Sequence, residues 1–247
     1  IKANAYGHGA IQCAHAIADE ADGFAVAAIE EALTLREAGI TAPILLLEGF
    51  FQAEELPEIE ANDLWIVVHH LWQVEVLNAA KLRNPLTVWL KMDSGMHRVG
   101  LAPEVYASAY AQLKKHPNIA QIVLMSHFAC ADEIASSYTK QQMQTFHAAV
   151  SGINAPISLS NSAGVLGWPG AYADWARPGI MLYGANPLAA QASNPITSLG
   201  VALRPVMQLT SSVISVRDIS CGEPVGYGCT FVAERATRVG VVACGYA

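Results

Sequence analysis

Charged side chains are scarce in this chain: only 14% of its 247 residues are Asp, Glu, Lys or Arg, whereas 53% are hydrophobic. This balance excludes an intrinsically disordered chain and indicates a large buried core. The net charge of −7 and the isoelectric point near 5.6 argue against a nucleic-acid partner, because nucleic acids are bound by basic surfaces.

Long apolar runs, paired cysteines and a leader segment are also missing. No run approaches the roughly 18 apolar residues that span a bilayer, and no signal peptide is recognisable. The five cysteines include no C-x-x-C pair, which suits a reducing compartment, so we expect a cytoplasmic protein with no membrane partner. Because Ile1 opens directly into a dense motif and Ala247 ends a strand-like run, we also expect a fragment truncated at both ends.

A G-x-G-x-x-G turn, typical of doubly wound nucleotide-binding sheets, follows none of the predicted strands. Instead, short apolar runs alternate with helical patterns as far as about residue 185. The runs that predict buried parallel strands are Phe24–Ala28, Pro43–Leu47, Leu64–Val68, Thr87–Lys91, Ile122–His127, Pro156–Leu159 and Ala173–Arg177. The stretches that predict helices are Ala10–Ala21, Ile29–Ala38, Gln52–Ala61, Leu71–Leu82, Pro103–Lys115 and Ser136–Val150.

This alternation predicts an α/β fold, a (β/α)8 TIM-type barrel whose first strand is mostly missing, with Ile1 and Lys2 as its stub. A doubly wound sheet is the alternative. After about residue 200 the pattern changes to the β-branched stretches Val206–Arg217 and Arg238–Cys244, with a turn at 221–224 between them. We therefore predict a barrel domain at residues 1–195 and the incomplete beginning of an all-β C-terminal domain at residues 196–247.

Several polar side chains follow the predicted strands. In a β/α barrel the carboxyl ends of the strands form one rim, where the active site lies. The residues expected on this rim are Lys2, Tyr6, Lys91, Arg98, His127, Asn161, Ser162, Arg177, Gly179 and Ile180. By contrast, Glu30, Glu31, Arg36 and Glu37 are expected on the solvent-facing side of the helix at 29–38.

Lys2 is the most informative of these residues. A lysine at a barrel mouth is either a solvated charge or, if buried, an amine with a lowered pKa that forms Schiff bases. The segments at 160–163 and 177–180 are interpreted as helix caps or as anion-binding sites. The two interpretations are compatible, because the free amides at the start of a helix bind anions. Two anion-binding corners near one lysine suit a phosphate-bearing aldehyde cofactor. His127 is either a core histidine or a site residue, and no metal site is predicted.

The segment Ile-Lys-Ala-Asn-Ala-Tyr-Gly-His-Gly at 1–9 closely resembles the pyridoxal-phosphate attachment motif of bacterial alanine racemases. Further blocks resemble the same family and occur in its order: Lys-Met-Asp-Ser-Gly-Met-His-Arg-Val-Gly at 91–100, Ser-His-Phe-Ala at 126–129, Ser-Asn-Ser-Ala at 160–163, Trp-Ala-Arg-Pro-Gly-Ile-Met-Leu-Tyr-Gly at 175–184, Gly-Tyr-Gly at 226–228 and Gly-Tyr-Ala at 245–247. A whole series of motifs in order is far more specific than any one of them.

The resemblance implies a role for each site residue. Lys2 would hold pyridoxal 5'-phosphate covalently and act as one catalytic base, with Tyr227 as the second base on the opposite face of the substrate. Tyr6, Asn161, Ser162, Gly179 and Ile180 would bind the cofactor, chiefly its phosphate. Arg177 would contact the pyridine nitrogen with His127 beside it. Arg98 would hold the substrate carboxylate, supported by Lys91, which is carbamylated in many members. Tyr246 would lie near the substrate channel.

The implied activity is the interconversion of L-alanine and D-alanine, for cell-wall synthesis or for D-alanine degradation. The implied assembly is a homodimer in which Tyr227 serves the neighbouring subunit's active site. Two alternatives stay open: a broad-specificity amino-acid racemase of the same fold, and a non-catalytic pyridoxal-phosphate-binding protein. The sequence decides neither the biosynthetic or catabolic role nor the carbamylation of Lys91.

Overall fold

The computed structural model describes residues 1–188 and 202–245. The chain divides into two compact units, Ile1–Val206 and Met207–Ala247. The predicted domain boundary between residues 195 and 196 lies outside the described residues, as does Tyr246. No helix in the described ranges has both the length and the apolarity to cross a membrane.

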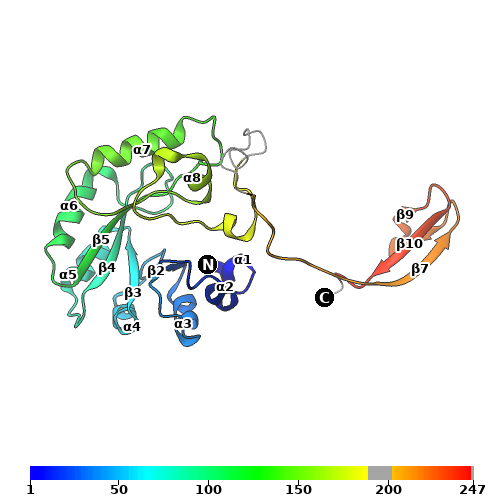
Figure 1. Cartoon of the computed structure of the whole chain (residues 1–247), viewed down its shortest axis with the longest axis horizontal. Helices are drawn as coiled ribbons and strands as arrows, with labels where there is room; N and C mark the ends of the chain where they lie inside the picture. Colours follow the sequence, from blue (N-terminus) through cyan, green and yellow to red (C-terminus); the bar gives the residue numbers. More distant parts are fainter. Residues whose placement is uncertain (189–201, 246–247) are drawn as a thin grey trace. The chain divides into compact units, whose positions relative to one another are not determined.

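A curled parallel sheet forms the centre of the first unit (Figure 1). Its strands are β1 (Phe24–Val26), β2 (Ile44–Leu46), β3 (Leu64–Val68), β4 (Leu86–Lys91), β5 (Ile119–Met125) and β6 (Ile157–Ser158). Each strand pairs only with its neighbours in sequence, so the order β1-β2-β3-β4-β5-β6 never reverses. A doubly wound sheet reverses its strand order, whereas a β/α barrel does not, so the predicted barrel class is confirmed.

Helices connect the strands and follow one another around the outside of the sheet (Figure 1). They are α2 (Ala10–Ala16), α3 (Ile29–Glu37), α4 (Leu56–Ala61), α5 (Leu71–Ala79), α6 (Pro103–Lys114) and α7 (Tyr138–Ala149), followed by the short α8 (Ser162–Gly167). The predicted helices are thus present, although α2 ends five residues and α5 three residues before the expected positions. Helical periodicity located these segments because each buries one apolar stripe against the sheet.

The strands are buried on both faces, which explains why they appear in the sequence as continuous apolar runs. Alternate residues of a strand belong to different clusters because side chains alternate across a sheet. In β2, Ile44 and Leu46 join the large cluster that includes the helices. Leu45 between them joins a smaller cluster with Val67 and Trp89, on the other face of the sheet.

The prediction of a strand at Ala173–Arg177 is wrong, because this segment forms no regular strand. Only a single parallel bridge, between Ser158 and Trp175, remains of it. Side chains replace the missing ladder: the carboxylate of Asp174 accepts a hydrogen bond from the Ile157 amide, and the Ser158 hydroxyl donates one to the Trp175 carbonyl. The segment therefore still lies beside β6 at the position expected for the next strand.

The prediction that Ile1 and Lys2 form the stub of a strand is also wrong. Helix α1 (Lys2–Tyr6) is instead a left-handed turn in which Ala3, Asn4, Ala5 and Tyr6 have φ between 52° and 55°. Such a run without glycine is uncommon, because the left-handed region costs an L-residue about 1–2 kcal/mol. The Ile1 amino group nevertheless donates a hydrogen bond to the Ala25 carbonyl of β1, so the turn begins beside the sheet.

The second unit consists of antiparallel strand pairs, as the sequence predicts. Strand β7 (Val213–Ile219) pairs with β10 (Thr237–Val242), and β8 (Pro224–Val225) pairs with β9 (Phe231–Val232). The predicted turn at 221–224 precedes β8, where Gly222 has φ of 86°. Tyr227 begins the 3-10 helix η4 (Tyr227–Cys229) between β8 and β9, and its side chain is 99% exposed.

Candidate active site

A cavity of about 1370 Å³ lies along the inner face of the curled sheet, from Gly23 and Pro43 before β1 and β2 to the residues that follow the carboxyl ends of the strands. All ten residues that the sequence places on the barrel rim line it: Lys2, Tyr6, Lys91, Arg98, His127, Asn161, Ser162, Arg177, Gly179 and Ile180. The structure therefore brings together residues that are up to 178 positions apart in the chain. The remaining predicted site residue, Tyr227, belongs to the second unit.

Glu31 anchors the left-handed turn that carries Lys2. Its carboxylate accepts hydrogen bonds from the amides of Ala3, at 2.6 Å, and Ala27, at 2.7 Å. This acidic side chain was expected in solvent but instead joins the cavity turn to the start of α3. Part of the signal was present in the sequence, because a glutamate in the first helical turn commonly reaches back to the preceding amides.

Tyr6 lies against an aromatic pair that sequence reasoning did not single out. The ring of Tyr183 lies 5.1 Å from that of Tyr6 and stacks on His8 at 4.4 Å between centroids. Burial raises the pKa of Tyr6, and burial also raises the pKa of Tyr183 to about 12. Tyr6 therefore keeps its proton at neutral pH and presents a hydroxyl donor to the cavity.

Ser162 and Gly179 build a compact polar corner beside Tyr6. The Ser162 hydroxyl oxygen accepts hydrogen bonds from the amides of Gly179, at 2.8 Å, and Met181, at 3.3 Å. A Cβ atom at position 179 would overlap the Tyr6 hydroxyl, so only glycine allows this approach. Asn161 caps α8, since its side-chain oxygen accepts from the Gly164 amide at 2.9 Å.

Arg177 joins β5, β6 and the predicted cofactor site. Its guanidinium donates to the carbonyl of Ser126 at 2.7 Å, to the hydroxyl of Ser158, and to Nδ1 of His127 at 3.3 Å. Because a guanidinium has no acceptor, His127 must accept at Nδ1 and is therefore neutral. Burial, together with the charge of Arg177, lowers the pKa of His127 to about 3, which agrees with this assignment.

Lys91 is buried among other cations. Its side chain is only 5% exposed, and burial followed by the charges of Arg177 and Arg98 lowers its pKa to about 8. Lys2 is a further cation on the cavity wall. The four positive groups make this side of the cavity a place for anions such as phosphate and carboxylate.

The loop that carries Arg98 is held by Asp93. The Asp93 carboxylate accepts hydrogen bonds from the amides of Gly95, at 3.0 Å, and His97, at 2.9 Å. Gly100 ends the loop with φ of 145°, and a Cβ atom there would overlap the Asp93 backbone. The loop therefore has a defined shape before any ligand binds.

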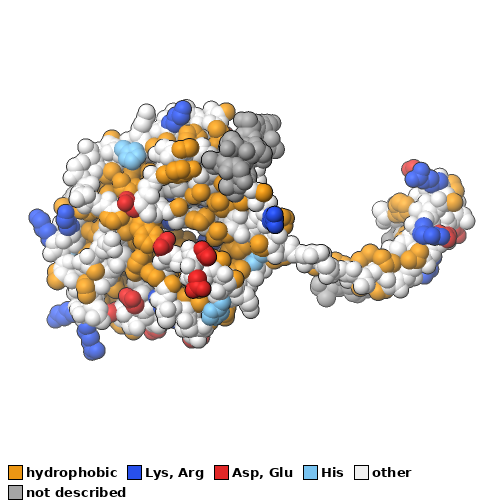
Figure 2. Space-filling model, viewed as in Figure 1, with side chains coloured by type: hydrophobic (Ala, Val, Ile, Leu, Met, Phe, Trp, Pro, Cys, Tyr) orange, Lys and Arg blue, Asp and Glu red, His pale blue; other side chains and the backbone are white. Residues whose placement is uncertain are grey.

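On the outer face of the first unit shown in Figure 2, Lys and Arg side chains are few and stand toward the margins. This face carries no continuous basic surface of the kind that binds nucleic acid.

A β/α-barrel unit whose cavity carries Lys2, Lys91, Arg98 and Arg177 on its wall, joined to a β unit, defines a class of small-molecule enzyme. Comparison with known proteins identifies the family. Residues 1–187 match the model of the alanine racemase N-terminal domain and residues 206–247 match that of the C-terminal domain. The chain belongs to the alanine racemase family.

Relatives of known name cover the whole chain. It is 61% identical to the alanine racemase of Pseudomonas taetrolens over 248 residues, which is 100% of this chain and 68% of that protein. It is 58% identical to the catabolic alanine racemase of Pseudomonas aeruginosa, with the same coverage. Among solved structures, the biosynthetic alanine racemase of Pseudomonas aeruginosa has a TM-score of 0.89 and 48% identity, covering 99% of this chain and 67% of that chain.

Proposed function

We propose that the whole protein interconverts L-alanine and D-alanine with pyridoxal 5'-phosphate, using Lys2 and Tyr227 as opposed bases. The observation that carries this proposal is the convergence of Lys2 and nine further predicted residues on one cavity. The identity of 58–61% to alanine racemases over the whole chain supports the substrate.

The cavity walls fit a phosphate group. The Ser162 oxygen already accepts from Gly179 and Met181, so its own proton is left to donate to another oxygen. The Tyr6 hydroxyl lies at the same corner, beside Gly179, and makes no hydrogen bond to any other described residue. Two hydroxyl donors at one corner of a cavity that four cations also line match the needs of a phosphate monoester.

When bound, pyridoxal phosphate supplies an aldehyde that captures the substrate amine and a ring that withdraws electrons from Cα. Burial lowers the pKa of Arg177 to about 10, which is still well above neutral pH. Arg177 would therefore donate a hydrogen bond to the pyridine nitrogen of the bound cofactor and keep its own proton. Neutral His127 fixes the orientation of Arg177 at 3.3 Å. By keeping its proton, Arg177 would limit electron withdrawal by the bound ring, which would favour rapid return of the proton to Cα.

Racemisation requires a proton to leave one face of Cα and another to arrive at the opposite face. Lys2 serves one face, and its backbone is fixed by the turn that Glu31 holds. Arg98 binds the substrate carboxylate, so that Cα is presented in one orientation. Tyr227 serves the other face from a neighbouring subunit of a homodimer. Its exposure in the second unit leaves the hydroxyl available for such a contact.

The substrate assignment is tested by racemisation of alanine, serine, lysine and arginine with the full-length protein. We expect the highest kcat/KM with alanine. A higher value with any of the larger substrates would support the broad-specificity alternative, and no turnover of any substrate would support a non-catalytic cofactor-binding protein.

The two-base assignment is tested by proton exchange in deuterated water. The Tyr227→Phe protein should lose interconversion but still exchange the Cα proton of one enantiomer, because the base on the opposite face remains. The Tyr172→Phe protein is the matched control, since Tyr172 is an exposed tyrosine of the first unit that does not line the cavity. Full interconversion by Tyr227→Phe would remove Tyr227 as a base.

A catabolic role is favoured over a biosynthetic one by a comparison within one organism. The chain is 58% identical to the catabolic alanine racemase of Pseudomonas aeruginosa and 48% identical to the biosynthetic one. We therefore expect that deleting the gene prevents growth on D-alanine as the carbon source. A strain that instead requires added D-alanine for its cell wall would indicate the biosynthetic role.

A further inference from the structure

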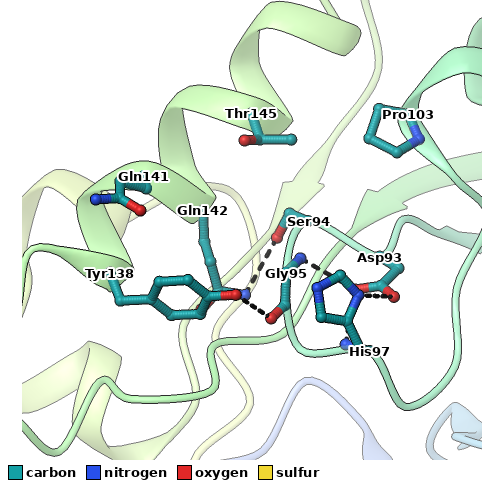
Figure 3. Close-up of a pocket in the computed structure, with 9 residues that line it drawn as sticks. All are labelled: Asp93, Ser94, Gly95, His97, Pro103, Tyr138, Gln141, Gln142 and Thr145. Carbon is teal, nitrogen blue, oxygen red and sulfur yellow. Dashed lines mark hydrogen bonds and ion pairs between the residues drawn. The ribbon is translucent and has the colours of Figure 1, made fainter.

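Helix α7 reaches two loops of the cavity through one buried glutamine. The Gln142 side chain is 1% exposed and does not line the large cavity. Its Nε2 donates to the His127 carbonyl at 3.0 Å, and its Oε1 accepts from the Ala129 amide at 2.9 Å. The same Nε2 donates at 3.4 Å to the Ser94 hydroxyl, in the loop that carries Arg98 (Figure 3).

The donor and the acceptor of each hydrogen bond around Gln142 can be assigned in only one consistent way. Ser126 Oγ donates to the Met92 carbonyl at 3.0 Å, so in its 2.7 Å contact with Ser94 it must accept. Ser94 therefore donates to Ser126 and accepts from Gln142. Both N–H groups and the oxygen of the Gln142 amide are then used, which fixes the orientation of the amide.

A second residue of α7 supports the same loop. Tyr138 Oη donates to the Gly95 carbonyl at 2.6 Å, and its side chain lies beside Gln142 in Figure 3. The far end of the network meets Arg177, whose guanidinium donates to the Ser126 carbonyl at 2.7 Å. Contacts from α7 thus reach the loops of Arg98 and His127 directly, and they reach the Arg177 guanidinium only through Ser126.

We propose that Gln142 is a positioning residue of the active site, which sets the Arg98 loop and the His127 loop relative to each other from outside the cavity. The inference rests on the proposed function, because it assigns catalytic value to that geometry. Gln142 touches neither substrate nor cofactor in this account and acts only through the two loops. A displacement of about 1 Å in such groups can lower turnover by up to ~100-fold.

The loop contacts are tested by hydrogen–deuterium exchange of the full-length protein. In Gln142→Leu, exchange should rise at least about threefold in peptides covering 93–100 and 127–131, because their anchoring hydrogen bonds are lost. Phe146→Leu is the matched control: Phe146 lies one turn further along α7, is fully buried, and belongs to the hydrophobic core cluster. It should lower Tm without raising exchange in these two peptides.

Ser94→Ala provides a milder variant should Gln142→Leu fail to fold. It removes one hydroxyl of the network and should raise exchange in peptide 93–100. If neither variant raises exchange above that of Phe146→Leu, the inference is overturned. This readout does not depend on which reaction the protein catalyses, so a protein that fails to racemise alanine would overturn the proposed function and leave the coupling of the loops intact.

Kinetics test whether the coupling acts through Arg98. We expect Gln142→Leu to lower kcat/KM for alanine about tenfold or more, mainly by raising KM, whereas Phe146→Leu changes it less than about twofold. In an Arg98→Lys background the effect of Gln142→Leu should shrink, because the loop no longer presents a guanidinium. Fully additive losses in the double variant would contradict a positioning role through Arg98.

Discussion

Replacing Lys91 by methionine should stabilise the cofactor-free protein at neutral pH. Methionine has a similar length and fills the same space, but it carries no charge. Burial lowers the pKa of Lys91 from 10.5 to about 8, and the side chain is only 5% exposed. This change in pKa corresponds to about 3 kcal/mol by which the fold disfavours the charged amine. Lys91→Met removes that cost, which would raise Tm by up to roughly 10 °C.

The pH dependence of this effect follows from the two pKa values. Below pH 8 the lysine is charged in both states, so the folded protein bears the full cost. Between pH 8 and 10.5 the unfolded state binds more protons, so the stability of the unmodified protein rises with pH. Above pH 10.5 both states are neutral and the cost is gone. The difference in the free energy of unfolding between Lys91→Met and the parent protein should therefore be greatest below pH 8. It should decrease as the pH rises above 8.

Urea unfolding of the full-length protein at pH 7, 9 and 10.5, in buffer free of carbon dioxide, measures this difference. Adding bicarbonate at pH 8 to 9 should stabilise only the parent protein, because carbamylation of the neutral amine replaces a cation with an anion beside Arg177 and Arg98. The reasoning is refuted if Lys91→Met is no more stable at pH 7 without bicarbonate, or if its advantage does not change with pH.

Three further predictions concern the site and the barrel. Gly179→Ala should weaken pyridoxal-phosphate binding at least about tenfold in an absorbance titration, since the new methyl group displaces the Tyr6 hydroxyl, whereas Gly170→Ala, in open space, should not. The His127 ring should show no NMR titration between pH 5 and 9, because its pKa is lowered to about 3; a midpoint near 6.5 would contradict the Arg177 contact. Arg36→Met should lower the free energy of unfolding by about 2 kcal/mol or more, because four carbonyl oxygens lose their hydrogen-bond donor. Arg83→Met, at an exposed position, should change this free energy little. An equal loss in both arginine variants would contradict the structural role of Arg36.

The strands and helices of the barrel were predictable because burial leaves a strong periodic pattern. Strand β3 begins and ends at the predicted Leu64 and Val68, since it is apolar throughout and bounded by polar residues. The predicted rim residues also converge, because the carboxyl ends of sequential parallel strands meet on one side. This rule needs only the strand positions and no knowledge of side-chain contacts.

The supporting contacts of the site were not predictable in the same way. Glu31 and Arg36 follow the polar side of the helical pattern, yet one holds the Ala3 amide and the other binds the carbonyl of Asn62 at 2.9 Å. Their partners lie 28 and 26 residues away, and periodicity contains no information about such pairs. Gln142 gave no chemical signal either, because an amide on a helix is ordinarily a surface residue.

The left-handed turn at Lys2–Tyr6 shows a different limit. Local propensity assigns such a backbone to glycine or asparagine, and only Asn4 in the sequence Lys-Ala-Asn-Ala-Tyr is of either type. The conformation is imposed by tertiary contacts, among them the hydrogen bond from the Ala10 amide to Asn4 at 2.8 Å. Strain of this kind is typical of functional sites, where the surroundings fix a residue in an unfavourable conformation.

Borohydride trapping tests the central claim most directly, namely that Lys2 carries the cofactor. The full-length protein is loaded with pyridoxal phosphate, treated with borohydride and digested, and the labelled peptide is identified by mass spectrometry. We predict that the label is on Lys2, that Lys2→Ala abolishes it, and that Lys91→Met, which changes the other lysine of the cavity, retains it. A label that persists in Lys2→Ala, or that is lost in Lys91→Met, would contradict the account.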